Sequence, residues 1–216
     1  MKTFVKNNLN DRLRSDYNTI AEKFDQTRIY LPTELENLVR QVIQLSTESP
    51  KTLDLGCGNG RTSQIFPSEA NYLGIDISDR LIELAKKRFP GRNFMAIDNI
   101  YQKNLIDDDF DLVLCLAVMH HLKGRAEQKK FIRRIFDFVK PNGYILVTVW
   151  HPYDKPPGDY IIPFDSAIKR FVHVFSLQEL HRLVSEQFKI ISINEKRYGR
   201  KPITNNLYII AKKIAS

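Results

Sequence analysis

The sequence predicts an α/β fold around a mainly parallel β-sheet. Short apolar runs alternate with segments of helical periodicity, and the connections between them are short, as in successive βαβ units. A glycine-rich turn directly follows the first apolar run. The last two strand-like runs are joined by a polar loop that is too short for a crossover helix, so they should pair antiparallel. We therefore expect parallel strands with an antiparallel pair only at the end of the chain.

Apolar runs that end in glycines or polar turns mark the expected strands. They cover residues 51–55, 71–77, 93–97, 110–116, 144–150, 188–194 and 207–211. The run Phe110 to Leu116 is almost wholly apolar, which is typical of a strand that is covered on both faces. Helices on both faces of the sheet should supply that cover.

Apolar spacing and capping residues place the expected helices. They cover Ser15 to Phe24, Pro32 to Leu45, Asp79 to Phe89, Arg125 to Val139 and Leu177 to Gln187, with a short helix at Arg61 to Phe66. Ser78 is a good N-cap, and Ser176 with Glu179 forms a capping box. We expect one domain over residues 1–216, with a helical cap at 1–48 and an ordered, proline-rich insertion at 151–175.

Composition narrows the class of protein. The 216 residues are 43% hydrophobic and 27% charged, which excludes a disordered or fibrous chain. No stretch approaches the roughly 20 apolar residues that cross a bilayer, so we expect a soluble, cytoplasmic protein without a membrane partner. Cys57 and Cys115 lack the spacing of a disulfide framework or a zinc site, and no metal is expected. The net charge of +8 is compatible with a polyanionic partner, although basic proteins without a nucleic-acid partner are also common.

The segment LDLGCGNG, Leu53 to Gly60, indicates a nucleoside site. It follows a strand and opens a helix, so backbone can approach a ligand at Gly56, Gly58 and Gly60. Asp76 ends the next strand, where a carboxylate can accept both hydroxyls of a ribose. The alternative is an ordinary tight turn. The loop reads GxGxG, not the GxGxxG of dinucleotide sites, and no Walker lysine follows it.

This arrangement resembles the first motif of the class I methyltransferases, which bind S-adenosylmethionine. The resemblance implies a Rossmann-like fold with a seven-stranded, mostly parallel sheet, an antiparallel last strand and helices on both faces. It also implies that cofactor-binding residues lie along the carboxyl edge of the sheet and on the cap: Gly56, Cys57 and Gly58 beside the amino-acid part, Asp76 at the ribose, Ile77, Asp98 and Asn99 around the adenine, Leu116 and Ala117 on the methionyl side, and Tyr17 on the cap. Asp98 could instead cap a following helix.

Three further parts of the chain resemble the tRNA methyltransferases that esterify 5-carboxymethyluridine at the wobble position. They are Tyr17 to Tyr30, Thr148 to Trp150, and Tyr160 to Phe164 with Lys169 to Leu180. They lie in the expected cap and insertion, outside the cofactor motifs. The chain departs from that family at Thr33 and Phe164, where tryptophan is usual, and at Asn142, where glycine is usual. The resemblance implies tRNA as substrate, with no DNA, and a small zinc-binding activator protein as partner.

A carboxylate acceptor is already ionised at neutral pH, so positioning can replace a general base. The acceptor-side candidates are therefore binders: Arg28 for the carboxylate or a phosphate, Trp150 for stacking on a base, and His173 for a hydrogen bond to the nucleoside. His121, of the pair His120 and His121, is the candidate for direct chemistry. Each has a structural alternative: an ion pair for Arg28, a core position for Trp150, a satisfied structural histidine for His173, and a helix cap or polar rim for the histidine pair.

Two alternatives compete with the tRNA methyltransferase. One is a small-molecule O- or N-methyltransferase of the same fold, and the other is a cofactor-binding regulatory subunit without turnover. Clustered basic residues could supply a track for phosphates or form only a solvated face. These residues are Lys123, Arg125, Lys129, Lys130, Arg133 and Arg134 on one helix, and Lys169, Arg170, Arg197, Arg200 and Lys201 in what we expect to be late loops.

Overall fold

The computed structural model of the protein describes residues 9–102, 106, 109–152, 154–164, 168–198 and 204–214. Its main sheet has seven strands in the order β3-β2-β1-β4-β5-β9-β8. The strands are β1 (Thr52–Leu55), β2 (Tyr72–Asp76), β3 (Asn93–Ala96), β4 (Phe110–Leu116), β5 (Val139–His151), β8 (Lys189–Tyr198) and β9 (Thr204–Lys212). Only β9 runs against its neighbours, because it pairs antiparallel with both β5 and β8. This confirms the predicted sheet, including its antiparallel last strand.

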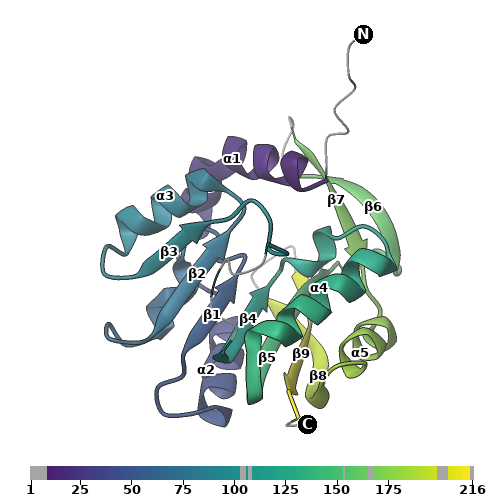
Figure 1. Cartoon of the computed structure of the whole chain (residues 1–216). Coiled ribbons are helices and arrows are strands. Elements are labelled where there is room, and N and C mark those ends of the chain that lie inside the picture. The colour runs from purple at the N-terminus through teal and green to yellow at the C-terminus, as the bar shows by residue number, and fades with distance from the viewer. Residues whose placement is uncertain are drawn as a thin grey trace.

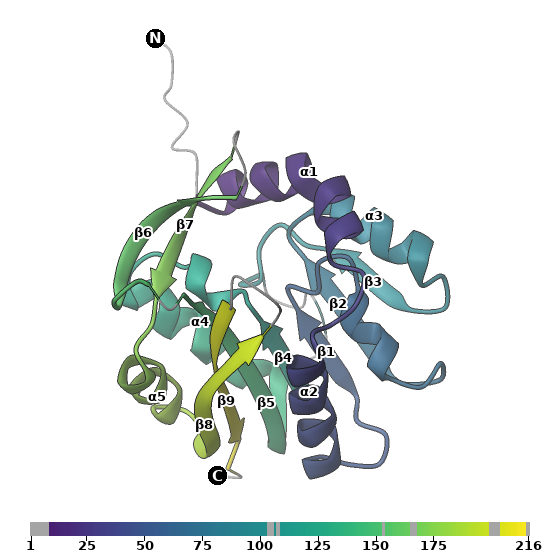
Figure 2. The ribbon, with the colours of Figure 1, turned by 180° about the vertical axis from the view of Figure 1, so that it is seen from behind.

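Helices cover both faces of this sheet. In β4, Leu112 and Leu114 join a core with α2 (Thr33–Leu45) and α3 (Asp79–Arg88), whereas Val113 and Cys115 join a core with α4 (Arg125–Phe138) and α5 (Leu177–Ser185). This alternation follows from the two-residue period of a strand. Figures 1 and 2 view the sheet from opposite sides, with α4 in front in the first and α2 in front in the second.

The helix caps that the sequence predicts are present in the structure. The Ser78 side chain accepts a hydrogen bond from the backbone N–H of Leu81 at the start of α3. Ser176 and Glu179 form the predicted capping box at the start of α5. Between β1 and β2 the chain has room only for a short 3-10 helix, Arg61–Ile65. Element boundaries set by such local chemistry agree with the sequence to within a few residues.

The first helix is longer than predicted. Helix α1 spans Leu9–Thr27, whereas the apolar spacing suggested Ser15 to Phe24. Its additional residues are mostly polar or charged, and Leu13 is the one buried apolar residue among their described side chains, so periodicity alone gave little signal there. Figures 1 and 2 show α1 lying across one end of the sheet. The guanidinium of Arg14 donates to the backbone carbonyls of Ile77 and Ile97, which follow β2 and β3, so this end is the carboxyl edge.

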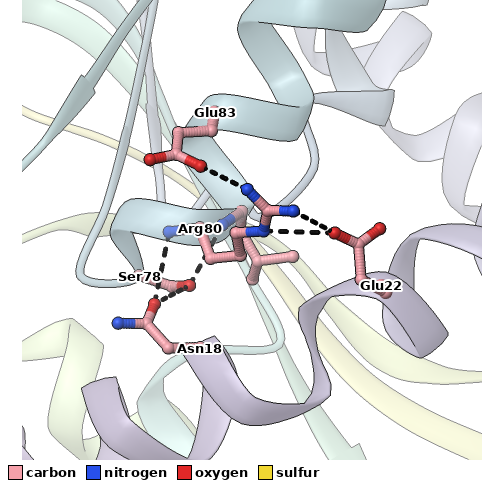
Figure 3. Close-up of polar contacts among 6 residues, drawn as sticks. Asn18, Glu22, Ser78, Arg80 and Glu83 are labelled. Atoms are coloured by element: carbon pink, nitrogen blue, oxygen red, sulfur yellow. Dashed lines mark hydrogen bonds and ion pairs between the residues drawn. The ribbon is translucent and has the colours of Figure 1, made fainter.

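A polar cluster fastens α1 to the start of α3 (Figure 3). Asn18 Oδ1 accepts from the Ser78 hydroxyl at 2.6 Å and from the Arg80 backbone N–H at 3.3 Å. The Arg80 guanidinium lies between the carboxylates of Glu22 on α1 and Glu83 on α3, and bonds to both. Because exposed ion pairs add little to stability, the cluster mainly sets the direction of α1 across the edge of the sheet.

The insertion after β5 contains two strands that the sequence did not predict. Strands β6 (Gly158–Pro163) and β7 (Lys169–Val174) form a separate antiparallel sheet. The four prolines of residues 151–164 lack the N–H group that a strand needs for pairing, but three of them lie outside the paired residues. This hairpin lies at the same end of the molecule as α1 (Figures 1 and 2). It packs on the 3-10 turn Met119–His121 that follows β4.

Candidate functional site

A cavity of about 740 Å³ lies at the carboxyl edge of the sheet, beneath α1 and beside the hairpin. This volume is within the range of small-molecule sites. The edge is also where the connections from β1 and β4 diverge to opposite sides of the sheet, the usual ligand position in open α/β sheets. Twelve predicted site residues line the cavity: Tyr17, Arg28, Gly56, Cys57, Gly58, Asp76, Ile77, Asp98, Leu116, Ala117, His121 and Trp150.

The glycine loop is folded tightly against β2. The backbone N–H groups of Gly56 and Cys57 both donate to the Ile75 carbonyl, at 2.8 and 3.0 Å. Gly56 has a φ of +78°, and a Cβ added there would lie 2.2 Å from Val118 Cγ2. The third glycine of the motif acts differently from our expectation, because a Cβ at Gly60 would meet the Phe94 ring at 2.6 Å. Gly60 is thus required for packing against β3 and does not line the cavity.

Asp76 is held by backbone amides from the glycine loop before it and from the residues that follow it. Its Oδ2 accepts from the Gly58 N–H at 2.8 Å and its Oδ1 from the Ser78 N–H at 2.9 Å. Burial raises the pKa of this carboxyl, and the backbone amides act in the opposite direction. A carboxylate has about four acceptor positions, so two remain for ligand hydroxyls. The geometry suits a diol held at the end of β2.

Asp54 is a second cavity carboxyl, and the sequence analysis did not select it. Its Oδ2 accepts from the Tyr72 hydroxyl at 2.6 Å, while Oδ1 is buried without a hydrogen-bond partner. Burial raises the pKa of Asp54 to about 6, although Tyr72 and Thr62 lower it. A buried acceptor without a partner is costly unless a ligand satisfies it. Its position, two residues before Gly56 at the end of β1, was the available sequence signal.

His121 belongs to a buried hydrogen-bonded chain. Its Nδ1 donates to the Phe171 carbonyl at 3.0 Å, which leaves Nε2 to accept from the Tyr17 hydroxyl at 2.9 Å. Arg170 then donates from Nη1 to the same Tyr17 oxygen at 3.1 Å. Burial and the Arg170 charge lower the pKa of His121 to about 4, so the imidazole is neutral at pH 7. Both ring nitrogens are therefore already engaged.

His120 is likewise buried and does not form a polar rim. Its Nδ1 accepts from the backbone N–H of Trp150 at 3.3 Å, and burial holds its pKa well below the usual range. This bond ties the turn after β4 to the end of β5. The Trp150 side chain lines the cavity and is partly exposed, so it is not a core residue.

The turn after β4 is strained. Ala117 has a φ of +59°, an unfavourable region for a residue with a Cβ. Its N–H donates to both the carbonyl and the hydroxyl oxygen of Thr148, each at 3.0 Å. These two bonds to β5 hold the backbone in this conformation beside the cavity.

Two predicted site residues do not line the cavity. His173 Nδ1 lies 2.6 Å from Asp159 across the β6–β7 hairpin, and its ring packs edge-on against Phe175. Asn99 Oδ1 accepts from the Tyr101 N–H at 2.9 Å and so closes a local turn. Asp98 does line the cavity and pairs with Arg14 of α1, and residues 100–102 after it form a turn and not the helix that the capping alternative required.

Many of the clustered cations have partners. On α4, Lys129 pairs with Glu186 at 2.8 Å, Lys130 lies 3.9 Å from the centroid of the Tyr101 ring, and Arg134 donates to the Ile100 carbonyl at 3.0 Å. Lys169, Arg170 and Arg197 are on strands and not in loops, while Arg200 and Lys201 are outside the described residues. Within the described residues no group of histidine, cysteine and carboxylate side chains is arranged to hold a metal ion, and no helix has the length and apolar character to cross a membrane.

Comparison with known proteins identifies the fold. A methyltransferase domain model matches residues 53–145. The crystal structure of 1,6-didemethyltoxoflavin-N1-methyltransferase from Burkholderia thailandensis, solved with S-adenosylhomocysteine, superposes with a TM-score of 0.71 at 21% identity, covering 94% of this chain and 88% of that chain. The chain therefore has the fold of the class I methyltransferases.

Two curated relatives carry the same name, tRNA (carboxymethyluridine(34)-5-O)-methyltransferase. The protein from Saccharomyces cerevisiae is 33% identical over 136 residues, which are 62% of this chain and 46% of that protein. The protein from Schizosaccharomyces pombe is 24% identical over 236 residues, covering 94% of this chain and 97% of that protein. The chain thus spans less than half the length of the first of these relatives and nearly the whole length of the second.

Proposed function

We propose that this protein is an S-adenosylmethionine-dependent tRNA methyltransferase that esterifies the carboxylate of 5-carboxymethyluridine, or of a close relative, at the wobble position. The observation that carries the proposal is that a single cavity joins two sets of residues. One set is the glycine loop with Asp54 and Asp76, and the other comes from α1 and the β6–β7 hairpin. The names of the two curated relatives support the choice of acceptor.

The donor end of the cavity fits the methyl donor. S-adenosylmethionine has a ribose diol, for which Asp76 has free acceptor positions, and two cationic groups, for which Asp54 has an unpartnered buried oxygen. Apolar side chains of Ile77, Leu81 and Ile97 line the same cavity and suit a base. When bound, the donor supplies an electrophilic methyl group on a positively charged sulfur.

The residues of this chain then act by binding and orientation. A carboxylate acceptor needs no base, and His121 is poorly suited to be one because both ring nitrogens are bonded and its pKa is about 4. Its role is to hold the Tyr17 hydroxyl. Trp150 offers a flat face against which a nucleobase can stack. Catalysis in this scheme comes from proximity and from exclusion of water beneath α1.

The remaining expectations are parts of the same proposal. Residues 1–216 would act as one domain, in which the cap within 1–48 and the insertion within 151–175 form the acceptor side. The partners would be tRNA, without DNA, and a small zinc-binding activator protein, in the cytoplasm. Co-purification with such an activator would support that partner, and full activity of the isolated chain would remove the requirement for it.

Methyl transfer to defined RNA tests the proposal. The purified chain is incubated with methyl-labelled donor and anticodon hairpins that have uridine or 5-carboxymethyluridine at the wobble position. We expect label only in the carboxymethyl hairpin, released by mild alkali as an ester should be. Asp76→Ala, which removes the diol acceptor, serves as the inactive control. Label that enters small carboxylic acids but no RNA would reject the tRNA assignment and favour the small-molecule alternative.

A further inference from the structure

Two arginines from distant parts of the sequence meet at the wall of the cavity. Arg28 follows α1, and Arg170 lies on β7. Their guanidinium carbons lie 5.3 and 5.0 Å from the centroid of the same aromatic ring, Phe164, and Arg28 also lies 4.6 Å from the ring of Phe24. Both arginines line the cavity. Both cations therefore lie close to Phe164 at the wall of the cavity.

Neither guanidinium has a carboxylate partner among the described residues. Arg28 Nη1 donates to the neutral Thr27 hydroxyl at 2.9 Å, and Arg170 Nη1 donates to the Tyr17 hydroxyl. Arg170 Nε is buried and has no partner at all. Other arginines that contact α1 are paired with acids: Arg14 with Asp98, Arg80 with Glu22, and Arg88 with Asp25. Arg28 and Arg170 differ in this respect from these three arginines.

This arrangement is unfavourable in the absence of an anion. Burial and the neighbouring Arg170 charge both lower the pKa of Arg28. Buried charges are normally paired, and a buried donor without a partner has lost its hydration without compensation. An anionic ligand between the two arginines would remove both penalties.

Tyr17 and His121 are neutral, so their hydrogen bonds orient the Arg170 guanidinium without neutralising its charge. Because Tyr17 donates its proton to His121, its oxygen is free to accept from Arg170. His121 in turn is anchored by the Phe171 carbonyl on the strand that carries Arg170. A carboxylate in place of Tyr17 would orient Arg170 equally well but would neutralise it.

We propose that Arg28 and Arg170 form the subsite for the carboxylate of the acceptor, and that this subsite distinguishes the acid from its methyl ester. The identity of the acceptor rests on the function proposed above. In the transfer a carboxylate oxygen forms a bond to the methyl carbon while the carbon–sulfur bond of the donor breaks and leaves its electron pair on sulfur. No proton has to move. The product is a neutral ester, so its charge-assisted hydrogen bonds to both guanidiniums are weakened and release is favoured.

The test compares three anticodon hairpins that differ only at the wobble base: uridine, 5-carboxymethyluridine and the methyl ester of the latter. Protein saturated with S-adenosylhomocysteine, which prevents turnover, is titrated with each. Binding is followed by the fluorescence of Trp150, which is the single tryptophan of the chain and lines the cavity. Arg170→Gln is the test variant, and Arg182→Gln, an exposed arginine on α5, is the matched control.

We expect wild type and the control to bind the acid hairpin at least about tenfold more tightly than the ester hairpin, as the loss of a charged hydrogen bond predicts. In Arg170→Gln this ratio should fall to about threefold or less, while the affinity for the ester and uridine hairpins stays the same. Equal weakening of all three hairpins would place Arg170 at a backbone phosphate and overturn the proposal. A wild-type protein without preference for the acid would also overturn it.

A second series separates this proposal from the tRNA assignment. If wild type neither binds nor methylates any hairpin, the tRNA assignment fails, and the same protein is titrated with phenylacetate and its neutral isostere phenylacetamide. A preference for the acid that Arg170→Gln abolishes retains the anion subsite. Absence of such a preference in both series overturns it.

A purely structural role for Arg170 gives a different pattern. In that case Arg170→Gln would lower the melting temperature or the affinity for S-adenosylhomocysteine and leave the ratio of acid to ester affinity unchanged, which overturns the proposal. Should Arg170→Gln fail to fold, Arg28→Gln tests the same ratio with the second arginine of the proposed subsite. Arg170→Lys, which keeps the charge but not the planar fork of donors, should restore part of the preference.

Discussion

Replacement of Asp54 by asparagine should weaken binding of the cationic donor without disturbing the fold. The asparagine side chain would keep an oxygen that accepts from the Tyr72 hydroxyl, but the buried negative charge at the cavity wall would be lost. A hydrogen bond to a charged group contributes about 1.5–3 kcal/mol, so affinity for S-adenosylhomocysteine, which has an ammonium group, should fall about 10- to 150-fold. The neutral analogue 5′-methylthioadenosine has no such group, and its affinity should stay the same.

The pH dependence of binding gives a second measure. With a pKa of about 6, Asp54 is ionised at pH 8 and largely protonated at pH 5. Affinity of wild type for S-adenosylhomocysteine should therefore decrease as pH falls through 6, while that of Asp54→Asn should be nearly independent of pH over the same range. Isothermal titration calorimetry with both ligands at pH 8, 7, 6 and 5 measures both effects.

The contribution of Asp54 to the free energy of unfolding should change with pH in the direction opposite to the affinity for S-adenosylhomocysteine. The pKa of Asp54 is higher in the folded protein than the ordinary value of 3.8, so the folded state binds more protons between these values. Its contribution to stability falls as pH rises from about 4 to 6 and stays unfavourable above. At pH 8, Asp54→Asn should thus unfold at a urea concentration equal to or higher than that of wild type, and its free energy of unfolding should be larger by at most about 3 kcal/mol.

Two results of the binding experiments would refute this reasoning. One is that Asp54→Asn binds both ligands equally more weakly than wild type, and the other is that the affinity of wild type does not change between pH 8 and 5.

Three further changes test other parts of the structure. Gly56→Ala forces a Cβ to 2.2 Å from Val118 at a φ of +78°, so it should cost about 2–4 kcal/mol in urea unfolding. Gly91→Ala, which meets no atom within 4 Å, should stay within about 1 kcal/mol of wild type, and equal costs for the two would contradict the packing argument. Because the pKa of His121 is lowered in the folded protein, the unfolded state takes up the proton first as pH falls. The free energy of unfolding of wild type should therefore decrease by up to about 3 kcal/mol between pH 6.5 and 4. His121→Gln should lack that share of the loss, and identical pH profiles of unfolding in the two proteins would show that the imidazole is not buried as described. Arg80→Ala removes the ion pairs at the start of α3 and should speed amide hydrogen exchange in α1 with little change in global unfolding, so unchanged exchange in α1 would show that this cluster does not hold the cap.

The cofactor side of the site was predictable because its residues are close in the chain. A strand, a glycine turn and the end of the next strand necessarily meet, so Gly56, Gly58 and Asp76 come together whatever the rest of the fold does. The Ser78 cap and the terminal antiparallel hairpin were predictable for a similar reason, since the cap depends on residues three positions apart and the hairpin on a connection too short for a crossover helix. Periodicity and capping chemistry report on such local geometry directly.

The acceptor side was predictable only in outline. The resemblance pointed to residues of the cap and the insertion, but no pattern indicated the strand pairing that carries Arg170 or its bond to Tyr17 on α1. His173, on the same strand, was predicted to reach the nucleoside but pairs with Asp159 across the hairpin.

Local sequence predicted that Tyr17 lies in a helical cap and Arg170 in an insertion near the sheet edge, and that Asp76 ends a strand close to a glycine turn. Only tertiary packing decided which side chains share the cavity, because that depends on how α1 and the β6–β7 hairpin are placed over β4 and β5. Contacts between residues so distant in the chain are selected by the fit of whole surfaces, and the spacing of residues within one element contains little information about that fit.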